Sequence, residues 1–183
     1  MSMGRRFAPS SLAMVILLGV ATYHPATVNA GGGFQPVSPE ESKITSEPLA
    51  PGAPAIILYR QVDRDDNGHT SHQDNYFRIK ILTEEGRKYA DIEIPFFKAS
   101  EDVVNVHART IRPDGSIANF DGKVFEKSLA KAKGMKVLAK TFTLSDVQVG
   151  SIIEYYYTAD LKDVYDSHWI LSEDLSHGAP GFP

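Results

Sequence analysis

From Ala55 onward, the hydrophobic residues of the chain follow a period of two. Apolar residues alternate with polar ones at Phe77, Ile79 and Ile81, and again along 104–109. Such alternation predicts β-strands with one buried face. The segment 147–158 (VQVGSIIEYYYT) is rich in β-branched and aromatic residues and predicts the strongest strand of the chain.

Turn residues separate the predicted strands. Pro113-Asp114-Gly115 favours a turn, because proline fixes φ and glycine permits a positive φ. It predicts a hairpin whose second strand contains Ile117 and Phe120. Glu84-Glu85-Gly86 predicts another turn, followed by a strand from Tyr89 to Phe97 in which Pro95 disfavours a central position.

Two later segments complete the pattern. Residues 123–141 mix helix-forming lysine and alanine with a central glycine, and we interpret them as two strands paired across Lys133-Gly134. Residues 164–171 predict a last strand. We interpret its Trp169 as a core anchor, with a docking or ligand-binding role as the alternative. Short strands separated by frequent turns predict a single all-β domain, an antiparallel β-sandwich over residues 55–175 with a tail at 176–183.

The N-terminus has a different pattern. Arg5 and Arg6 precede an apolar run of ten residues, Leu12 to Ala21, and Val28-Asn29-Ala30 offers small residues for cleavage. These are the three parts of a secretory signal peptide, here residues 1–30. The run is too short to span a membrane, which takes roughly 20 residues. We therefore expect an exported protein, periplasmic or extracellular, with no membrane span in the mature chain.

Residues 31–54 predict a tether rich in proline and glycine, interrupted by one short helix. Ser38 is a typical N-cap residue, Pro39 suits the first helical position, and Glu41 completes a capping box. The helix is expected to end near Ile44.

Composition narrows the functional classes. The chain is 42% hydrophobic and 10% aromatic, which is typical of a globular protein. Loss of Arg5 and Arg6 with the signal peptide would lower the net charge from −4 to −6. Without a basic patch, nucleic acid is an unexpected partner. The absence of cysteine excludes disulfides, thiolate zinc sites and a thiol nucleophile. No motif predicts a cofactor.

Several motifs together resemble a known family. They are Asp102-Val103-Val104-Asn105-Val106, the stretch Thr110 to Gly115, the stretch Lys140 to Leu144, and Asp146 to Tyr155 with its Gly-Ser-Ile-Ile-Glu-Tyr motif. Over roughly residues 45–175 the chain resembles the domain of unknown function, number 3857, that precedes transglutaminase-like domains in exported bacterial proteins.

This resemblance implies a β-sandwich-like N-terminal module of a larger protein. The usual partner domain has a papain-like Cys-His-Asp fold, and this chain has no cysteine to receive that catalytic role. We therefore expect a chain that stops before any catalytic domain. Transglutaminase-like or cysteine-peptidase activity would need that partner domain, so we expect a non-catalytic accessory module that acts by contact with such a domain or with another protein.

The sharpest local motif is acidic. Asp63, Asp65, Asn67 and Gly68 match the start of a twelve-position calcium loop that would end at Asp74. The flanks predict strands rather than helices, and Asp-Asp-Asn-Gly is also typical of a hairpin tip. We favour the hairpin, and keep a calcium- or zinc-dependent binding protein or hydrolase built on residues 63–74 as the alternative.

Glu154 is the unusual residue of the strongest strand, because its neighbours are apolar and aromatic. A buried carboxylate is costly unless it is paired, and Arg109 or Arg112 could pair with it. We favour a structural role, either an outward-facing side chain or an ion pair that fixes strand register. The alternative is a carboxylate that docks a partner or ligand.

Overall fold

The structure, a computed structural model, describes residues 33–66, 70–132 and 135–162. Its elements, in chain order, are α1 (Pro39–Lys43), β1 (Ala55–Asp65), β2 (Thr70–Ile81), the 3₁₀ helix η1 (Glu84–Ala90), β3 (Asp91–Phe97), β4 (Glu101–Ile111), β5 (Ile117–Asn119), β6 (Phe125–Ala132), β7 (Met135–Thr143) and β8 (Ile152–Lys162).

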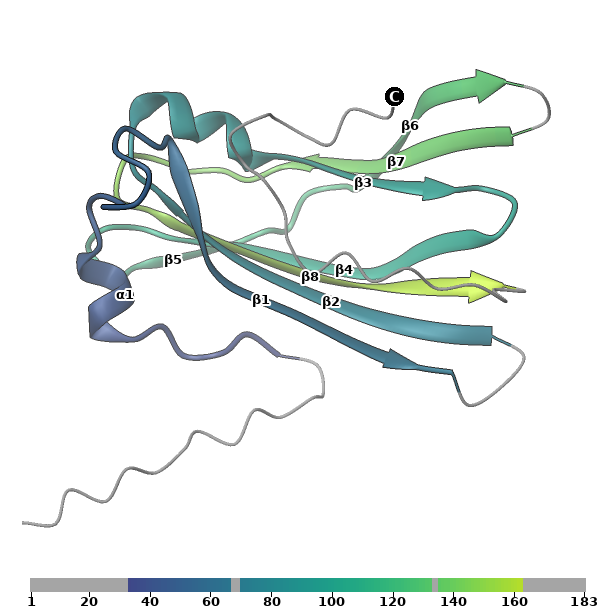
Figure 1. The fold of residues 1–183 in the computed structure, drawn as a ribbon, viewed down its shortest axis with the longest axis horizontal. Helices are drawn as coiled ribbons and strands as arrows, with labels where there is room; N and C mark the ends of the chain where they lie inside the picture. The colour runs from purple at the N-terminus through teal and green to yellow at the C-terminus, as the bar shows by residue number, and fades with distance from the viewer. Residues whose placement is uncertain (1–32, 67–69, 133–134, 163–183) are drawn as a thin grey trace, which may run out of the picture. The chain divides into compact units, whose positions relative to one another are not determined.

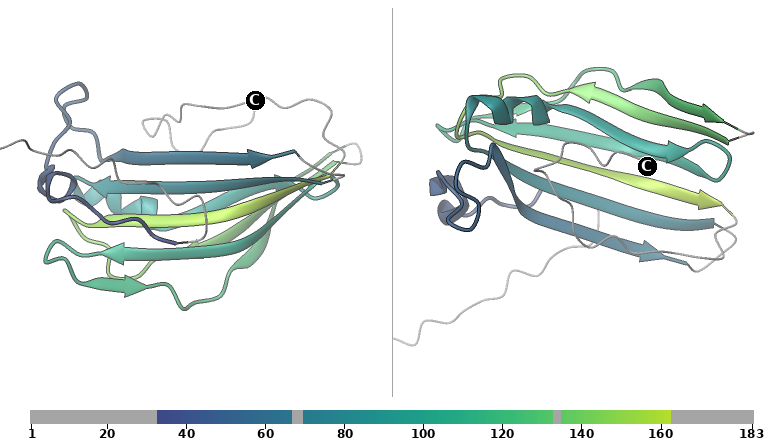
Figure 2. Two further views of the ribbon diagram at one scale, coloured as in Figure 1. Left: turned by 90° about the horizontal axis from the view of Figure 1, so that it is seen from below. Right: turned by 45° about the horizontal axis from the view of Figure 1, so that its top comes forward.

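The strands form two antiparallel sheets. Sheet A has five strands in the order β1-β2-β8-β4-β5, and sheet B has three in the order β3-β7-β6. Figure 1 shows sheet B lying over one face of sheet A, and Figure 2 shows the two layers from other sides. The prediction of a single all-β antiparallel domain is therefore confirmed.

The hydrophobic core lies between the two sheets. Ile79 and Ile153 enter it from sheet A, and Ile94, Phe96 and Leu138 enter it from sheet B. Alternation along β2 sends Phe77, Ile79 and Ile81 into this core. The intervening residues Tyr76, Arg78 and Lys80 consequently face the other side of sheet A, its outer face.

Three predicted hairpins are present. Asp63 pairs with Asp74 across the β1–β2 hairpin, Thr110 with Ala118 across β4–β5, and Lys127 with Ala139 across β6–β7. Pro95 lies on β3, which is an edge strand of sheet B as its missing N–H requires. The capping box around Ser38 and Glu41 also forms, and α1 ends at Lys43.

Two predicted boundaries were wrong. The strand expected from Tyr89 begins at Asp91, because residues 84–90 form a 3₁₀ helix. The strand expected from Val147 begins at Ile152. Gly150 has φ of +86°, a left-handed conformation that interrupts an extended strand, and a side chain there would meet Pro113 at 3.3 Å. The Gly-Ser motif thus turns the chain before β8.

Other predictions lie outside the described residues. They are the signal peptide over 1–30, the strand over 164–171 with Trp169, and the tail at 176–183. Within the part of the chain that the structure describes, no helix is both long and apolar enough to cross a membrane.

Candidate functional site

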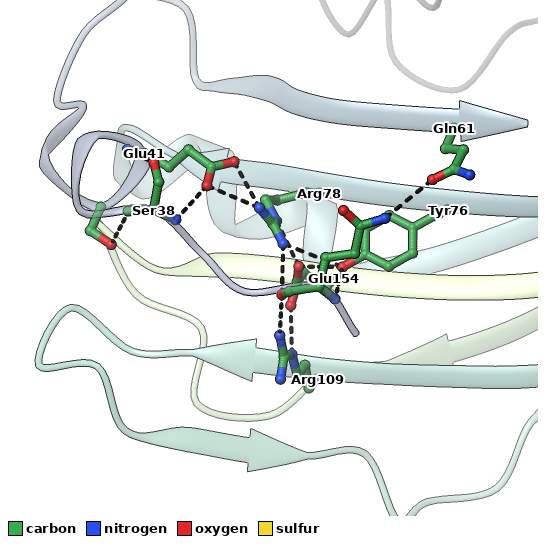
Figure 3. Close-up of polar contacts among 9 residues, drawn as sticks. Ser38, Glu41, Gln61, Tyr76, Arg78, Arg109 and Glu154 are labelled. Carbon is green, nitrogen blue, oxygen red and sulfur yellow. Dashed lines mark hydrogen bonds and ion pairs between the residues drawn. The ribbon is translucent and has the colours of Figure 1, made fainter. Parts of the chain in front are cut away.

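Glu154 lies in the middle of sheet A and is completely buried. Its strand, β8, runs between β2 and β4, and the register places Arg78 on one side of Glu154 and Arg109 on the other. Directly opposed residues point to the same face of a sheet. The backbone register therefore holds one carboxylate between two guanidinium groups on the outer face of sheet A (Figure 3).

Both oxygens of Glu154 are occupied. Oε1 accepts hydrogen bonds from Arg78 Nε at 2.6 Å and from the Tyr76 hydroxyl at 2.5 Å. Oε2 accepts a hydrogen bond from Arg109 Nε at 2.5 Å. The side chains of Arg78 and Arg109 are only 5% and 14% exposed, so these are charge-assisted bonds largely shielded from water.

A second carboxylate balances the charge. Glu41, on α1, accepts hydrogen bonds from Arg78 Nη1 with both oxygens, at 2.8 and 2.9 Å. Two glutamates and two arginines make the cluster electrically neutral. Because a buried charge is tolerated only when it is paired and hydrogen-bonded, this neutrality explains how Glu154 can be buried as an ion.

Residues 34–43, which we call the N-terminal strap, lie on this cluster. The Gln35 carbonyl accepts hydrogen bonds from Nη2 of Arg78 and of Arg109, at 2.9 and 3.1 Å, and the Gln35 N–H donates to the Tyr76 hydroxyl. Lys80 Nζ donates to the Ser42 carbonyl at 2.9 Å. This part of the predicted tether is thus packed against the domain, because its polar backbone groups are partners of buried side chains.

Phe34 extends the strap with apolar contacts. Its ring lies edge-on to Tyr156, with centroids 5.1 Å apart, and the Arg109 guanidinium lies 4.3 Å from its centroid. His107 stacks on the Tyr156 ring at 4.8 Å. Aromatic and cation–π contacts of this kind add to the hydrogen bonds of the strap.

The environment shifts the pKa of several of these groups. Burial, together with the hydrogen bond and charge of Glu154, raises the pKa of Tyr76 to about 12. Burial raises the pKa of Glu41, but the hydrogen bond from the Ser38 N–H and the Arg78 guanidinium together lower it by more. The pKa of Glu41 is therefore below its ordinary value. Burial lowers the pKa of Lys80.

The cluster has the properties of a structural tie rather than a reactive site. Glu154 receives three donors, and Tyr76 both donates to Glu154 and accepts from Gln35. A general acid or base must reach a proton of its substrate, and here the Glu154 oxygens and the Tyr76 hydroxyl are bonded to groups of the protein itself. The hydrogen bonds of the cluster join β2, β8, β4 and the strap.

The structure brings together only part of what the sequence predicted. Glu154 and Arg109 meet, whereas Arg112, the other suggested partner, bonds to Asp146 at an exposed position. Arg78, Tyr76 and Glu41 were missed. Polar residues at alternate positions of β2 are typical of a solvent-facing strand surface, and only the capping box hinted that Glu41 has a fixed position.

The described residues on either side of the acidic motif belong to strands β1 and β2. Asp63 accepts a hydrogen bond from Gln61 and Asp74 accepts one from Thr158, while His72 bonds to Asp160. Asn67 lies outside the described residues. In the ranges that the structure describes, no three His, Cys, Asp or Glu side chains gather to hold a metal ion. Metal binding by residues 63–74 stays a prediction.

Comparisons with known proteins agree with this fold. A crystal structure described as that of "a putative protease from Parabacteroides distasonis" superposes with a TM-score of 0.50 at 15% identity, covering 61% of this chain and 24% of that chain. No curated protein matches significantly. The profile of a family described as a "Domain of Unknown Function with solved-structure structure (DUF3857)" matches residues 67–178. Since that match spans more than half of the sequence, the chain belongs to the DUF3857 family.

Proposed function

We propose that this protein is a non-catalytic, exported accessory domain that acts by contact with a second domain or protein, of the transglutaminase-like kind. The observation that carries the proposal is the internal use of the Glu154 cluster. Its carboxylates and guanidinium groups bond to each other and to the strap, and so stabilise a scaffold rather than present reactive groups to a substrate.

Two further observations support an accessory role. The structure with a similar fold belongs to a chain of which this domain covers 24%, so there the fold is one part of a longer protein that is described as a protease. The family resemblance of the sequence also implies a place ahead of transglutaminase-like domains. Export is supported by the Arg5-Arg6 pair, the apolar run and the small residues before Gly31.

Site-specific photo-crosslinking of the full chain in bacterial cells tests the contact. A photoreactive residue is placed in turn at exposed positions of different elements: Leu49, Ile117, Phe125 and Val149. We expect a discrete crosslink to one exported protein from some positions and none from others, on a protein whose mature N-terminus is Gly31. Absence of crosslinks from every position, or a cytoplasmic protein that retains Met1, would contradict the proposal.

Activity and metal measurements separate the accessory role from its rival. The purified full chain is assayed for peptide hydrolysis and for amine transfer to unfolded casein, and is titrated calorimetrically with calcium and zinc. We expect no turnover and no heat of binding. Turnover, or metal binding that Asp65→Ala removes, would favour the metal-dependent alternative.

A further inference from the structure

Within the described residues, strand β6 pairs with β7 only, and its other contacts are ion pairs of Lys127 with Glu93 on β3 and of Glu126 with Lys98. It is an edge strand of sheet B, and all of its residues from Phe125 to Lys131 are exposed on both faces of the sheet. Phe125 is 61% exposed and Leu129 is 39% exposed. Its neighbour β7, in contrast, buries Leu138 and Ala139 almost completely. The sandwich therefore ends at β7, and β6 projects beyond it.

Such a strand gains little from folding. Burial of apolar area is the main stabilising contribution to a sheet, and β6 buries little of it. Like charges also face each other here, since Lys131 lies directly opposite Lys136, which weakens the pair further. An edge strand that exposes apolar side chains is a candidate surface for contact with another chain.

The charge of this hairpin indicates the chemistry of the partner. Described residues between 123 and 140 include five lysines, at 123, 127, 131, 136 and 140, and one acid, Glu126. Glu126 already binds Lys140 at 2.8 Å, and Lys127 binds Glu93 of β3 at 2.6 Å, which leaves Lys123, Lys131 and Lys136 as the remaining cations of the hairpin. The chain as a whole carries a net charge of −4, so the hairpin is a basic region on an acidic protein. The expectation that the chain has no basic patch is therefore wrong for this hairpin. A second β6 strand would bring more lysine against lysine, whereas an acidic segment would neutralise it.

We infer that β6 is a docking strand for an extended, acidic and apolar segment of another protein, which adds to sheet B as a fourth strand. Main-chain hydrogen bonds to the free edge would give affinity, as in other cases of strand addition. Phe125 and Leu129 would bury apolar side chains of the segment, and Lys123 and Lys131 would select carboxylates. This inference rests on the proposed function and names the surface that performs it.

The test uses the full chain and a fluorescent eight-residue peptide of alternating glutamate and valine. We expect saturable binding by fluorescence anisotropy that weakens as salt is raised. The double variant K123E/K131E should reduce affinity about tenfold or more, because it reverses two charges beside the peptide. A matched variant, K43E/K162E, reverses two exposed lysines on other elements and should leave affinity unchanged.

A second probe tests for strand addition. The same peptide with N-methyl groups at alternate residues keeps its side chains but cannot form a ladder of hydrogen bonds, so it should not bind. Equal binding of the methylated peptide, or equal loss in both double variants, would overturn the inference. So would sedimentation that shows a dimer of the full chain lost in K123E/K131E, because the occupant would then be a second copy.

The outcomes distinguish this inference from the proposed function. Crosslinks to an exported protein from Ile117 or Val149, without any from Phe125, would reject β6 as the docking strand and leave the accessory role standing. Absence of crosslinks from every position would reject the accessory role itself.

Discussion

The outer face of sheet A buries charged side chains, while strand β6 of sheet B exposes hydrophobic ones. Glu154 and Arg78 are 0% and 4% exposed, whereas Phe125 is 61% exposed. Residue polarity alone would predict the reverse. The difference arises from what covers each surface. The strap supplies backbone and carboxylate partners to the first. Within the described residues, β7 is the only strand that pairs with the second, and no segment covers its Phe125 side chain.

This comparison shows two ways of using a sheet surface. A covered polar face fixes register and joins segments distant in sequence, since a buried ion pair is costly in any other arrangement. An uncovered apolar strand contributes little to stability and leaves contact area for a partner. Stability and recognition are therefore expected to be separable by mutation, and the following predictions test that separation.

The largest effect is expected at Glu154. Glu154→Gln keeps the shape of the side chain but removes the charge between Arg78 and Arg109, and leaves two buried guanidinium groups with one carboxylate, Glu41, in the cluster. We expect the free energy of unfolding to fall by about 3–5 kcal/mol. Urea unfolding followed by circular dichroism measures it. The matched change Glu126→Gln, at an exposed ion pair, should cost at most about 1 kcal/mol. Equal losses in the two variants would contradict the structural role of Glu154.

A smaller loss of stability is expected when Glu41 is changed. Glu41→Gln removes the bidentate bond to Arg78 and should cost about 1–2 kcal/mol. Because the strap is the segment released, tryptic cleavage after Lys43 should accelerate in this variant. Resistance equal to that of the wild type would show that Glu41 does not hold the strap.

Glu41 also predicts that the strap is released at acidic pH. The folded-state pKa of Glu41 is below its ordinary value of 4.5. Its stabilising contribution is therefore complete above about pH 4.5 and is lost as the pH falls through the lower folded-state pKa. Cleavage after Lys43 by an acid-stable lysine-specific protease should rise over that range in the wild type. The rate of cleavage in Glu41→Gln should depend less on pH over the same range.

Tyr76→Phe is expected to have a still smaller effect, about 1 kcal/mol, since Glu154 keeps both arginine partners. The pKa of Tyr76 is raised from 10.0 to about 12, so its contribution is complete below pH 10 and is lost as the pH rises toward 12. Urea midpoints of the wild type and Tyr76→Phe should therefore converge between pH 10 and pH 11.5. Parallel curves would contradict the hydrogen bond to Glu154.

Sequence patterns were sufficient to predict most of the strands and the Glu154–Arg109 pair of the buried cluster. Period-two alternation gave β2 and β4, and Lys133-Gly134 gave the β6–β7 hairpin. Glu154 stood out because a carboxylate in an apolar strand needs a partner, and Arg109 lies beside it in the structure. The strands and Glu154 are signalled by residues close together in the chain, whereas Arg109 is 45 residues away from Glu154.

Arg78 could not be identified in this way. Its neighbours on β2 alternate as they would on a strand facing water, and it is buried only because the strap folds back from more than thirty residues upstream. No local pattern encodes where the strap docks. The 3₁₀ helix over 84–90 was missed for a related reason, because Gly86 packs so closely against Pro54 that a side chain would meet the Pro54 carbonyl at 2.1 Å.

The smallest effect on stability is expected at β6. Phe125→Ser removes a large apolar side chain, but that side chain is mostly in water in the isolated domain. We expect the free energy of unfolding to change by no more than about 0.5 kcal/mol. A buried phenylalanine offers the matched control, since Phe96→Ala in the core should cost about 3–5 kcal/mol. Binding of the glutamate–valine peptide should nevertheless weaken in Phe125→Ser. A stability loss approaching that of Phe96→Ala would mean that Phe125 is packed in solution, and β6 would then belong to the core rather than to a docking surface.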